Sequence, residues 1–83
     1  MEGERLDFET MSEDKKKLHC VVLSNRAMAN LKSQNTAKAL EDATESLRYN
    51  PKYAKSYYRR AECLKKLGKY RESLKDFKKV TQL

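Results

Sequence analysis

The sequence predicts an all-α protein of about four helices, stacked as a fragment of an α-solenoid. Three observations predict this class. Apolar residues recur at spacings of three and four, and no stretch alternates strictly between apolar and polar residues. Glycine occurs twice and proline once. The chain also repeats with a period of 34 residues, since SNRA (24–27) recurs as YRRA (58–61), and such a period with helical spacing is typical of stacked helical hairpins.

The first helix is expected to begin near residue 12. Thr10 or Ser12 can cap its start, and the acidic residues that follow suit the positive end of a helix. The helix is expected to end near residues 33–35, with Asn35 in the left-handed conformation that glycine usually adopts. The series spaced by three and four along it is Leu18, Val21, Val22, Asn25, Met28 and Leu31.

Proline and glycine delimit the other three helices. Thr36 is expected to begin the second helix, which Asn50 and Pro51 end because the residue before proline avoids helical dihedral angles. Gly68 is expected to cap the third helix at its C-terminal end. The predicted inner faces are Ala39, Leu40, Ala43 and Leu47 in the second helix, Ala54, Tyr57, Ala61, Leu64 and Leu67 in the third, and Tyr70, Leu74, Phe77 and Val80 in the fourth.

The helices are expected to pair as two antiparallel hairpins. The turns at 33–36 and 68–70 are too short to connect helices in any other way. Small residues at matching places would let the paired helices approach closely. These residues are Ala27, Ala39, Ala61 and Ser73.

Charge divides the chain into two parts. The net charge is +7, but residues 1–14 carry six acids and one base, a net −5, whereas residues 15–83 carry eighteen bases and six acids, a net +12. We therefore expect an acidic flexible arm over 1–11 and a helical domain over 12–83. A body this basic favours acidic partners, whether peptide, nucleic acid or anionic membrane, although most surface lysines simply solvate helix faces. The arm itself could fold back over the basic domain.

Residue types and spacings argue against an enzyme, a cofactor or a metal site. The only histidine, His19, is followed by Cys20, which projects about 100° away on a helix, so the two cannot form a nucleophile–base pair. Cys20 and Cys63 lack any metal-ligand spacing and are expected to be free, buried thiols. No apolar run approaches the length of a membrane span. A soluble, cytoplasmic protein is predicted.

Residues 20–83 resemble the tetratricopeptide repeat (TPR) family. The turn Leu67-Gly68-Lys69-Tyr70 matches the family's Leu-Gly-x-Tyr pattern, and Pro51 stands at the characteristic proline position. The resemblance implies repeat units at about 20–53 and 54–83, the second truncated by the chain end. The first unit departs from the pattern, because it has Ser-Gln-Asn-Thr at 33–36 in place of the glycine turn.

Within that family the chain is similar to the co-chaperone type, whose domains bind the acidic, carboxylate-ended tails of Hsp70 and Hsp90. Asn25-Arg26-Ala27 and the Lys55-x-x-x-Arg59 spacing carry this similarity. It implies that Asn25, Lys55 and Arg59 fill three of five carboxylate-clamp positions. The other two belong to a preceding repeat and have no match, so the chain resembles the second and third repeats of such a domain.

The residue chemistry supports an anion site independently of the resemblance. Lys55 and Arg59 lie one helical turn apart and therefore share a face. Asn25 is the repeat equivalent of Arg59, and packed helices lie about 8–10 Å apart, so one carboxylate can be reached from both helices. Arg59 would supply a bidentate fork, Lys55 a mobile charge and Asn25 an uncharged donor.

Two other functions remain open at this point. A generic TPR scaffold, or a module that self-associates through exposed repeat ends, would use the apolar surface at the ends of the stack. Nucleic-acid binding, the less favoured reading, would use the aromatic and basic cluster of the third helix. That cluster is Tyr53, Tyr57, Tyr58, Arg59 and Arg60.

Overall fold

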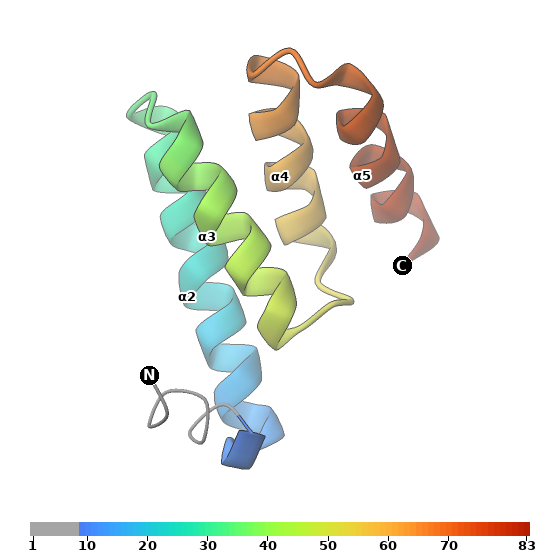
Figure 1. The fold of residues 1–83 in the computed structure, drawn as a ribbon. Coiled ribbons are helices and arrows are strands. Elements are labelled where there is room, and N and C mark those ends of the chain that lie inside the picture. Colours follow the sequence, from blue (N-terminus) through green and yellow to red (C-terminus); the bar gives the residue numbers. More distant parts are fainter. Residues whose placement is uncertain (1–8) are drawn as a thin grey trace.

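The computed structural model describes residues 9–83 and confirms the all-α prediction (Figure 1). The predicted acidic arm falls mostly on residues 1–8, outside the described part. No described helix is long and apolar enough to cross a membrane. The helices are α2 (Glu13–Lys32), α3 (Thr36–Tyr49), α4 (Ala54–Lys66) and α5 (Tyr70–Gln82).

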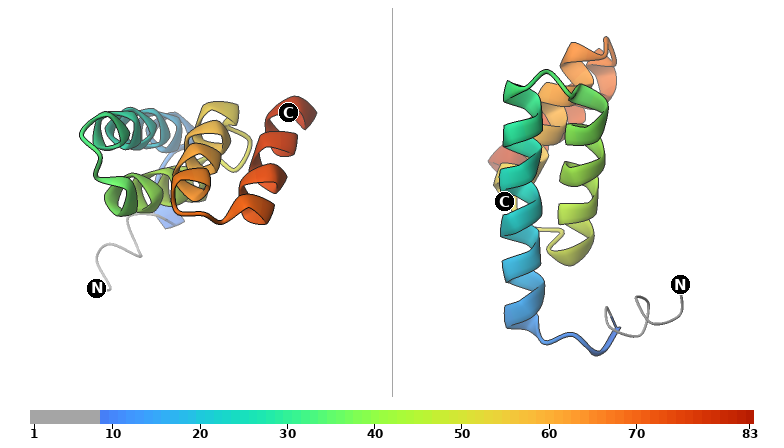
Figure 2. Two further views of the ribbon diagram at one scale, coloured as in Figure 1. Left: turned by 90° about the horizontal axis from the view of Figure 1, so that it is seen from above. Right: turned by 90° about the vertical axis from the view of Figure 1, so that its left-hand side faces the viewer.

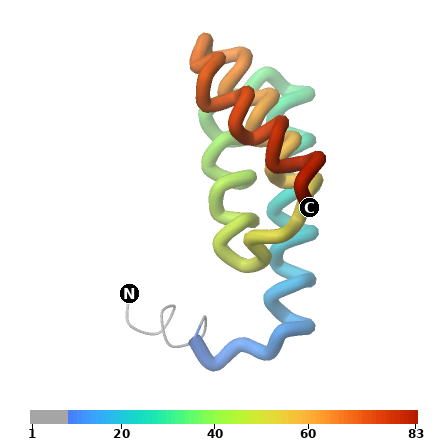
Figure 3. Tube along the Cα trace, turned by 90° about the vertical axis from the view of Figure 1, so that its right-hand side faces the viewer, coloured from blue at the N-terminus to red at the C-terminus, as the bar shows by residue number. Residues whose placement is uncertain are grey.

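The helices form two antiparallel hairpins placed side by side, as predicted. Figure 2 shows α2 paired with α3, and α4 paired with α5 in the next hairpin. Helix α3 packs on both α2 and α4, so it joins the hairpins. Figure 3 shows the same stack from the side of α5, which is the last helix. Because the direction alternates, α2 and α4 run the same way and contact each other along one side of the stack.

Equivalent turns close the two hairpins. Gly68 has φ +79°, and the amides of Gly68 and Lys69 donate to Lys65 O (3.1 Å) and Leu64 O (2.8 Å). In the first hairpin Gln34, with φ +64°, makes the corresponding bond to Leu31 O. The prediction of Asn35 as the left-handed residue was therefore wrong. The repeat itself explains this, because Gln34 stands 34 residues before Gly68.

The other predicted helix boundaries were confirmed. Ser12 caps α2, because its side chain accepts a hydrogen bond from the Lys15 amide at 3.2 Å. Asn50 adopts an extended conformation (φ −145°, ψ 93°) ahead of Pro51 and ends α3. The Tyr57 hydroxyl then donates to the Pro51 carbonyl oxygen at 2.8 Å, which ties the connecting loop to α4.

The core is built mainly from small residues. Ala27, Ala39 and Ala61 are completely buried and Ser73 is nearly so, which confirms their predicted role in close helix approach. Ser73 Oγ donates to the Ala61 carbonyl oxygen at 2.8 Å, so α5 is hydrogen-bonded directly to the backbone of α4. The predicted inner face of α3 was also confirmed, with Ala39, Ala43 and Leu47 buried and Leu40 partly buried.

Most of the apolar series that runs along α2 does not lie in the core. The buried residues of α2 are Cys20, Ser24, Ala27 and Leu31. Leu18, Val21, Val22 and Met28 are instead exposed. Small side chains face α3 because they allow close contact, whereas the larger apolar residues lie on another face of the helix. Three apolar residues at the end of α4 and in α5 are also exposed, although the sequence predicted that they point inward. They are Leu67, Tyr70 and Leu74. Within the described residues, α5 packs mainly on α4 and no further helix covers its other side.

Candidate functional site

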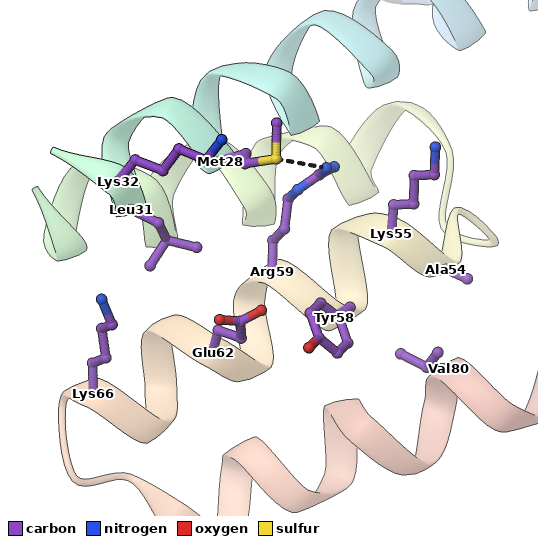
Figure 4. Close-up of a pocket in the computed structure, with 10 residues that line it drawn as sticks. All are labelled: Met28, Leu31, Lys32, Ala54, Lys55, Tyr58, Arg59, Glu62, Lys66 and Val80. Atoms are coloured by element: carbon purple, nitrogen blue, oxygen red, sulfur yellow. Dashed lines mark hydrogen bonds between the residues drawn. The ribbon is translucent and has the colours of Figure 1, made fainter. Parts of the chain in front are cut away.

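A groove with a volume of about 590 Å³ lies where α2, α4 and α5 face one another (Figure 4). It combines apolar walls with basic side chains. The lining residues are Met28, Leu31, Lys32, Ala54, Lys55, Tyr58, Arg59, Glu62, Lys66 and Val80.

Helical periodicity explains why these residues share the groove. Lys55, Arg59, Glu62 and Lys66 are separated by four, three and four residues, so they form one stripe along the whole of α4. Met28 and the adjoining turn of α2 provide the facing stripe. Because α2 and α4 run in the same direction (Figure 1), the lining residues follow one another along both helices.

Arg59 connects the two helices across the groove. Its guanidinium donates from Nη1 to Ser24 Oγ and from Nη2 to Met28 Sδ, the latter at 3.3 Å. Ser24 is fully buried in α2, so it is a fixed acceptor. Arg59 is itself half-buried. These contacts hold the arginine fork at the groove wall and leave its Nε free to donate to a ligand, because the described structure gives Nε no acceptor.

Lys55 lies one turn before Arg59 and also lines the groove. It is exposed, and no described carboxylate lies within ion-pair distance of its ammonium group. The structure therefore brings two of the three predicted clamp residues, Lys55 and Arg59, into one groove. An exposed ammonium without an internal partner keeps its charge available for an anion.

Asn25 is not among the residues that line the groove. It is an exposed residue of α2, directly after Ser24 and one turn before Met28. Those two residues are the ones that Arg59 contacts, so Asn25 lies at the same level of the stack as Arg59, on the turn that continues the groove wall.

Several groove residues were missed by the sequence analysis. Lys32 and Lys66 form one basic pair of the lining, and Glu62 is its acidic member. The 34-residue spacing of Lys32 and Lys66 was a usable signal, because it is also the spacing of Asn25 and Arg59. Ser24 carried no such signal, since its role depends on the conformation of Arg59.

The aromatic and basic cluster of α4 does not form one array. Arg60 forms an ion pair with Asp76 and lies 5.5 Å from the centre of the Tyr57 ring. Tyr58 packs edge-on against Phe77, with ring centroids 5.6 Å apart. Arg59 turns instead towards α2. These separate contacts do not create the continuous stacking surface that nucleic-acid binding would require.

The two cysteines and the histidine lie outside the groove. Cys20 and Cys63 are free and buried. Burial raises the pKa of Cys63 to about 11, with a smaller contribution from the charge of Glu62. His19 is exposed and stacks on Tyr49, with ring centroids 5.3 Å apart. The described residues contain no group of three or more potential metal ligands.

Comparison with known proteins identifies relatives of this fold. The family model described as "Tetratricopeptide repeat" matches residues 54–83. Serine/threonine-protein phosphatase 5 from Homo sapiens is 37% identical over 65 residues, which are 78% of this chain and 13% of the phosphatase. Tetratricopeptide repeat protein 28 from Mus musculus is 39% identical over 59 residues, which are 71% of this chain and 2% of that protein. The chain thus spans a small part of these relatives.

A solved structure matches the arrangement of the hairpins. It is the second TPR of Spaghetti (RPAP3) bound to the HSP90 peptide SRMEEVD. The TM-score is 0.76 and the sequence identity is 36%, over 77% of this chain and 56% of that chain.

Proposed function

This chain is made of tetratricopeptide repeats, and we propose that it binds the acidic, carboxylate-ended tail of a chaperone of the Hsp90 or Hsp70 class. The groove of the described structure supports this proposal. It brings together two cationic side chains, Lys55 and Arg59, beside an apolar wall. The likeness to a TPR bound to an HSP90 peptide supports the choice of partner.

The observation that carries the proposal is the contact of Arg59 with α2. Its bond to Ser24 holds the arginine next to the turn that contains Asn25, and Lys55 lies one turn before Arg59 on α4. A terminal carboxylate could accept from Arg59 and Lys55 on one side and from the Asn25 amide on the other. Hydrogen bonds to charged groups contribute about 1.5–3 kcal/mol each, so three donors suffice for weak, specific capture.

The proposed role is binding and not catalysis. The phosphatase relatives are matched over the repeat region alone, which is 13% of phosphatase 5. We further propose a reducing, cytoplasmic location, because the two thiols of this chain are free and buried.

Calorimetry with an acidic heptapeptide tests the proposal. The free-acid peptide should bind more tightly than the same peptide with a C-terminal amide, because the amide removes one carboxylate. Lys55→Ala, Arg59→Ala and Asn25→Ala should each weaken binding of the free acid. Lys38→Ala is the matched control, because Lys38 is an exposed lysine of α3 whose ion pair is with Glu41, away from the groove. Equal affinities for acid and amide would overturn the proposal.

A generic TPR scaffold that associates with itself or with another protein is the second candidate. The exposed apolar residues Leu67, Tyr70 and Leu74 towards α5 favour it. Light scattering over a wide concentration range separates the two functions, since self-association predicts a mass that rises with concentration. A monomer at every concentration would remove the self-associating form.

A further inference from the structure

The outer face of α5 carries exposed apolar residues. Tyr70 and Leu74 lie one turn apart on this face, with 64% and 59% of their surfaces exposed. Leu67, in the turn that precedes the helix, is 45% exposed. Figure 3 views the stack from this side, with α5 in front. In the described part of the chain α5 packs mainly on α4, so this apolar surface is left in solvent.

A basic stripe runs along α5 beside these apolar residues. Arg71, Lys75 and Lys78 are separated by four and three residues, so they share one side of the helix. Arg71 and Lys78 lie about 100° and 80° around the helix from Tyr70. All three cations are exposed, and none forms an ion pair with a carboxylate among residues 9–83. Glu72, the exposed carboxylate of α5, lies about 160° from Tyr70, so the basic stripe is uncompensated next to the apolar residues.

An apolar stripe beside a basic stripe on one helix is typical of helices that lie on an anionic membrane. The apolar side chains enter the boundary between headgroups and acyl chains, and the cations contact the lipid phosphates. Tyrosine suits this boundary because its ring is apolar and its hydroxyl remains hydrated.

The other possible partners match this face less well. A second copy of the chain would bring like charges together, because residues 15–83 carry eighteen bases and six acids. Nucleic acid would match the cations, but its bases stack on aromatic side chains, whereas Leu67 and Leu74 are aliphatic. The combination of aliphatic residues and cations therefore favours lipid.

We propose that the outer face of α5 binds the surface of an anionic phospholipid membrane. Leu67, Tyr70 and Leu74 enter the interfacial region of the bilayer, and the basic stripe of α5 contacts the phosphate groups. The helix lies on the membrane and does not cross it.

The membrane face and the groove lie on different sides of α5. Val80 lines the groove and follows Arg71 by nine residues, which is about 180° around the helix. Figure 4 shows Val80 facing the other lining residues. The inference therefore does not rest on the proposed function, because a peptide in the groove leaves the basic stripe accessible.

Sedimentation with phosphatidylcholine vesicles, with and without phosphatidylserine, tests the role of charge. The unmodified chain should bind the vesicles that contain phosphatidylserine and should be released by salt. The triple variant Arg71→Gln/Lys75→Gln/Lys78→Gln should bind them about a hundredfold more weakly, since each cation near an anionic surface contributes about fivefold. The matched control is Lys15→Gln/Lys17→Gln/Lys38→Gln, which removes the same charge from exposed positions of α2 and α3 and should have a much smaller effect. Equal losses in the two variants, or equal binding to neutral and anionic vesicles, would overturn the proposal.

Tryptophan fluorescence tests the role of the apolar residues. The chain contains no tryptophan, so a single introduced tryptophan reports on its own surroundings. With vesicles that contain phosphatidylserine, the emission of Leu74→Trp should shift to shorter wavelength and be quenched by brominated lipid. The matched control is Leu18→Trp, at an exposed residue of α2 at the other end of the stack, which should show neither change. Circular dichroism confirms that each variant is folded.

The same variant distinguishes a membrane from a second copy of the chain. If the emission of Leu74→Trp does not change with vesicles, the membrane contact is overturned. If it shifts with protein concentration in the absence of vesicles, a second copy covers the face of α5 and the proposal is also overturned. An emission that depends on anionic vesicles alone supports the membrane contact.

Discussion

Arg60 of α4 holds the carboxylate of Asp76 of α5 with two hydrogen bonds, from Nε at 2.8 Å and from Nη2 at 2.9 Å. The first hairpin contains the same two-point pair 34 residues earlier, between Arg26 and Asp42. Both aspartates are buried, and each pair joins the two helices of one hairpin. The repeat thus preserves an ion pair inside each hairpin as well as its small core residues.

Removing the aspartate of the second pair should destabilise the fold. Asp76→Ala leaves the partly buried Arg60 guanidinium without its acceptor, so the free energy of unfolding should fall by about 1–3 kcal/mol in urea denaturation. The matched control is Glu41→Ala, which breaks an exposed pair with Lys38 and should cost at most about 1 kcal/mol. Equal losses in the two variants would contradict the structural role of the buried pair.

Two serines at the junction of the hairpins should differ in importance. Ser46 Oγ donates to the Cys20 carbonyl oxygen at 2.8 Å and lies 2.6 Å from Ser56 Oγ, so Ser56 is the donor between them. Ser46→Ala would leave the buried Ser56 hydroxyl without its acceptor, at a cost of about 1–3 kcal/mol. Ser56→Ala keeps the Cys20 bond and should cost less. Thermal unfolding of both variants gives the order, and the reverse order would refute this network.

Ser24 should act on ligand affinity through Arg59. The variant Ser24→Ala removes the acceptor that holds Arg59 against α2, while alanine suits the close contact with α3. Affinity for a free-acid acidic peptide should fall about twofold to tenfold, in line with one lost hydrogen bond. Thermal unfolding of Ser24→Ala is the control for the fold, because a midpoint close to that of the unmodified chain shows that the contact with α3 is kept. Unchanged affinity in Ser24→Ala would show that Arg59 needs no positioning.

Removing the glycine of one hairpin turn should destabilise the fold, whereas introducing a glycine into the other turn should not. Gly68→Ala places a Cβ at φ +79° and should cost about 1 kcal/mol, even though no atom within 4 Å would meet the new Cβ. Gln34→Gly relieves the same left-handed conformation in the first turn and should not destabilise the fold. Denaturant titration measures both. A stable Gly68→Ala variant would indicate that the turn can relax.

The buried thiol of Cys63 should make stability depend on pH in the alkaline range. Its folded pKa is raised to about 11 from an ordinary 9.0, mainly because burial disfavours the thiolate. A raised folded pKa means that this contribution is present below pH 9 and is lost as the pH rises from about 9 to about 11. Cys63→Ala should show a flatter decline over that range. If the free energy of unfolding fell equally with pH in the unmodified chain and in Cys63→Ala, the raised pKa of Cys63 would be contradicted.

Much of the fold could be predicted from local patterns and from the repeat. Pro51 and Gly68 act on the conformation of their own turns, so the helix boundaries beside them were predictable. The position of Gln34 could also have been read from the repeat, had the second turn been mapped onto the first. For the candidate site, the shared face of Lys55 and Arg59 follows from spacing on one helix. The bond from Arg59 to Ser24 joins residues 35 apart and depends on the conformation of one long side chain.

The sequence by itself therefore determined the helices, their antiparallel pairing and the residues that share each helical stripe, because capping, proline, glycine and periodicity act over a few residues. Only the tertiary structure decided which stripe of α2 is buried. The series with Leu18 and Val22 and the series with Ser24 and Ala27 are both helical in spacing, and close packing against α3 selects the smaller side chains. The same choice leaves Met28 on the outer wall, where it forms the groove with α4.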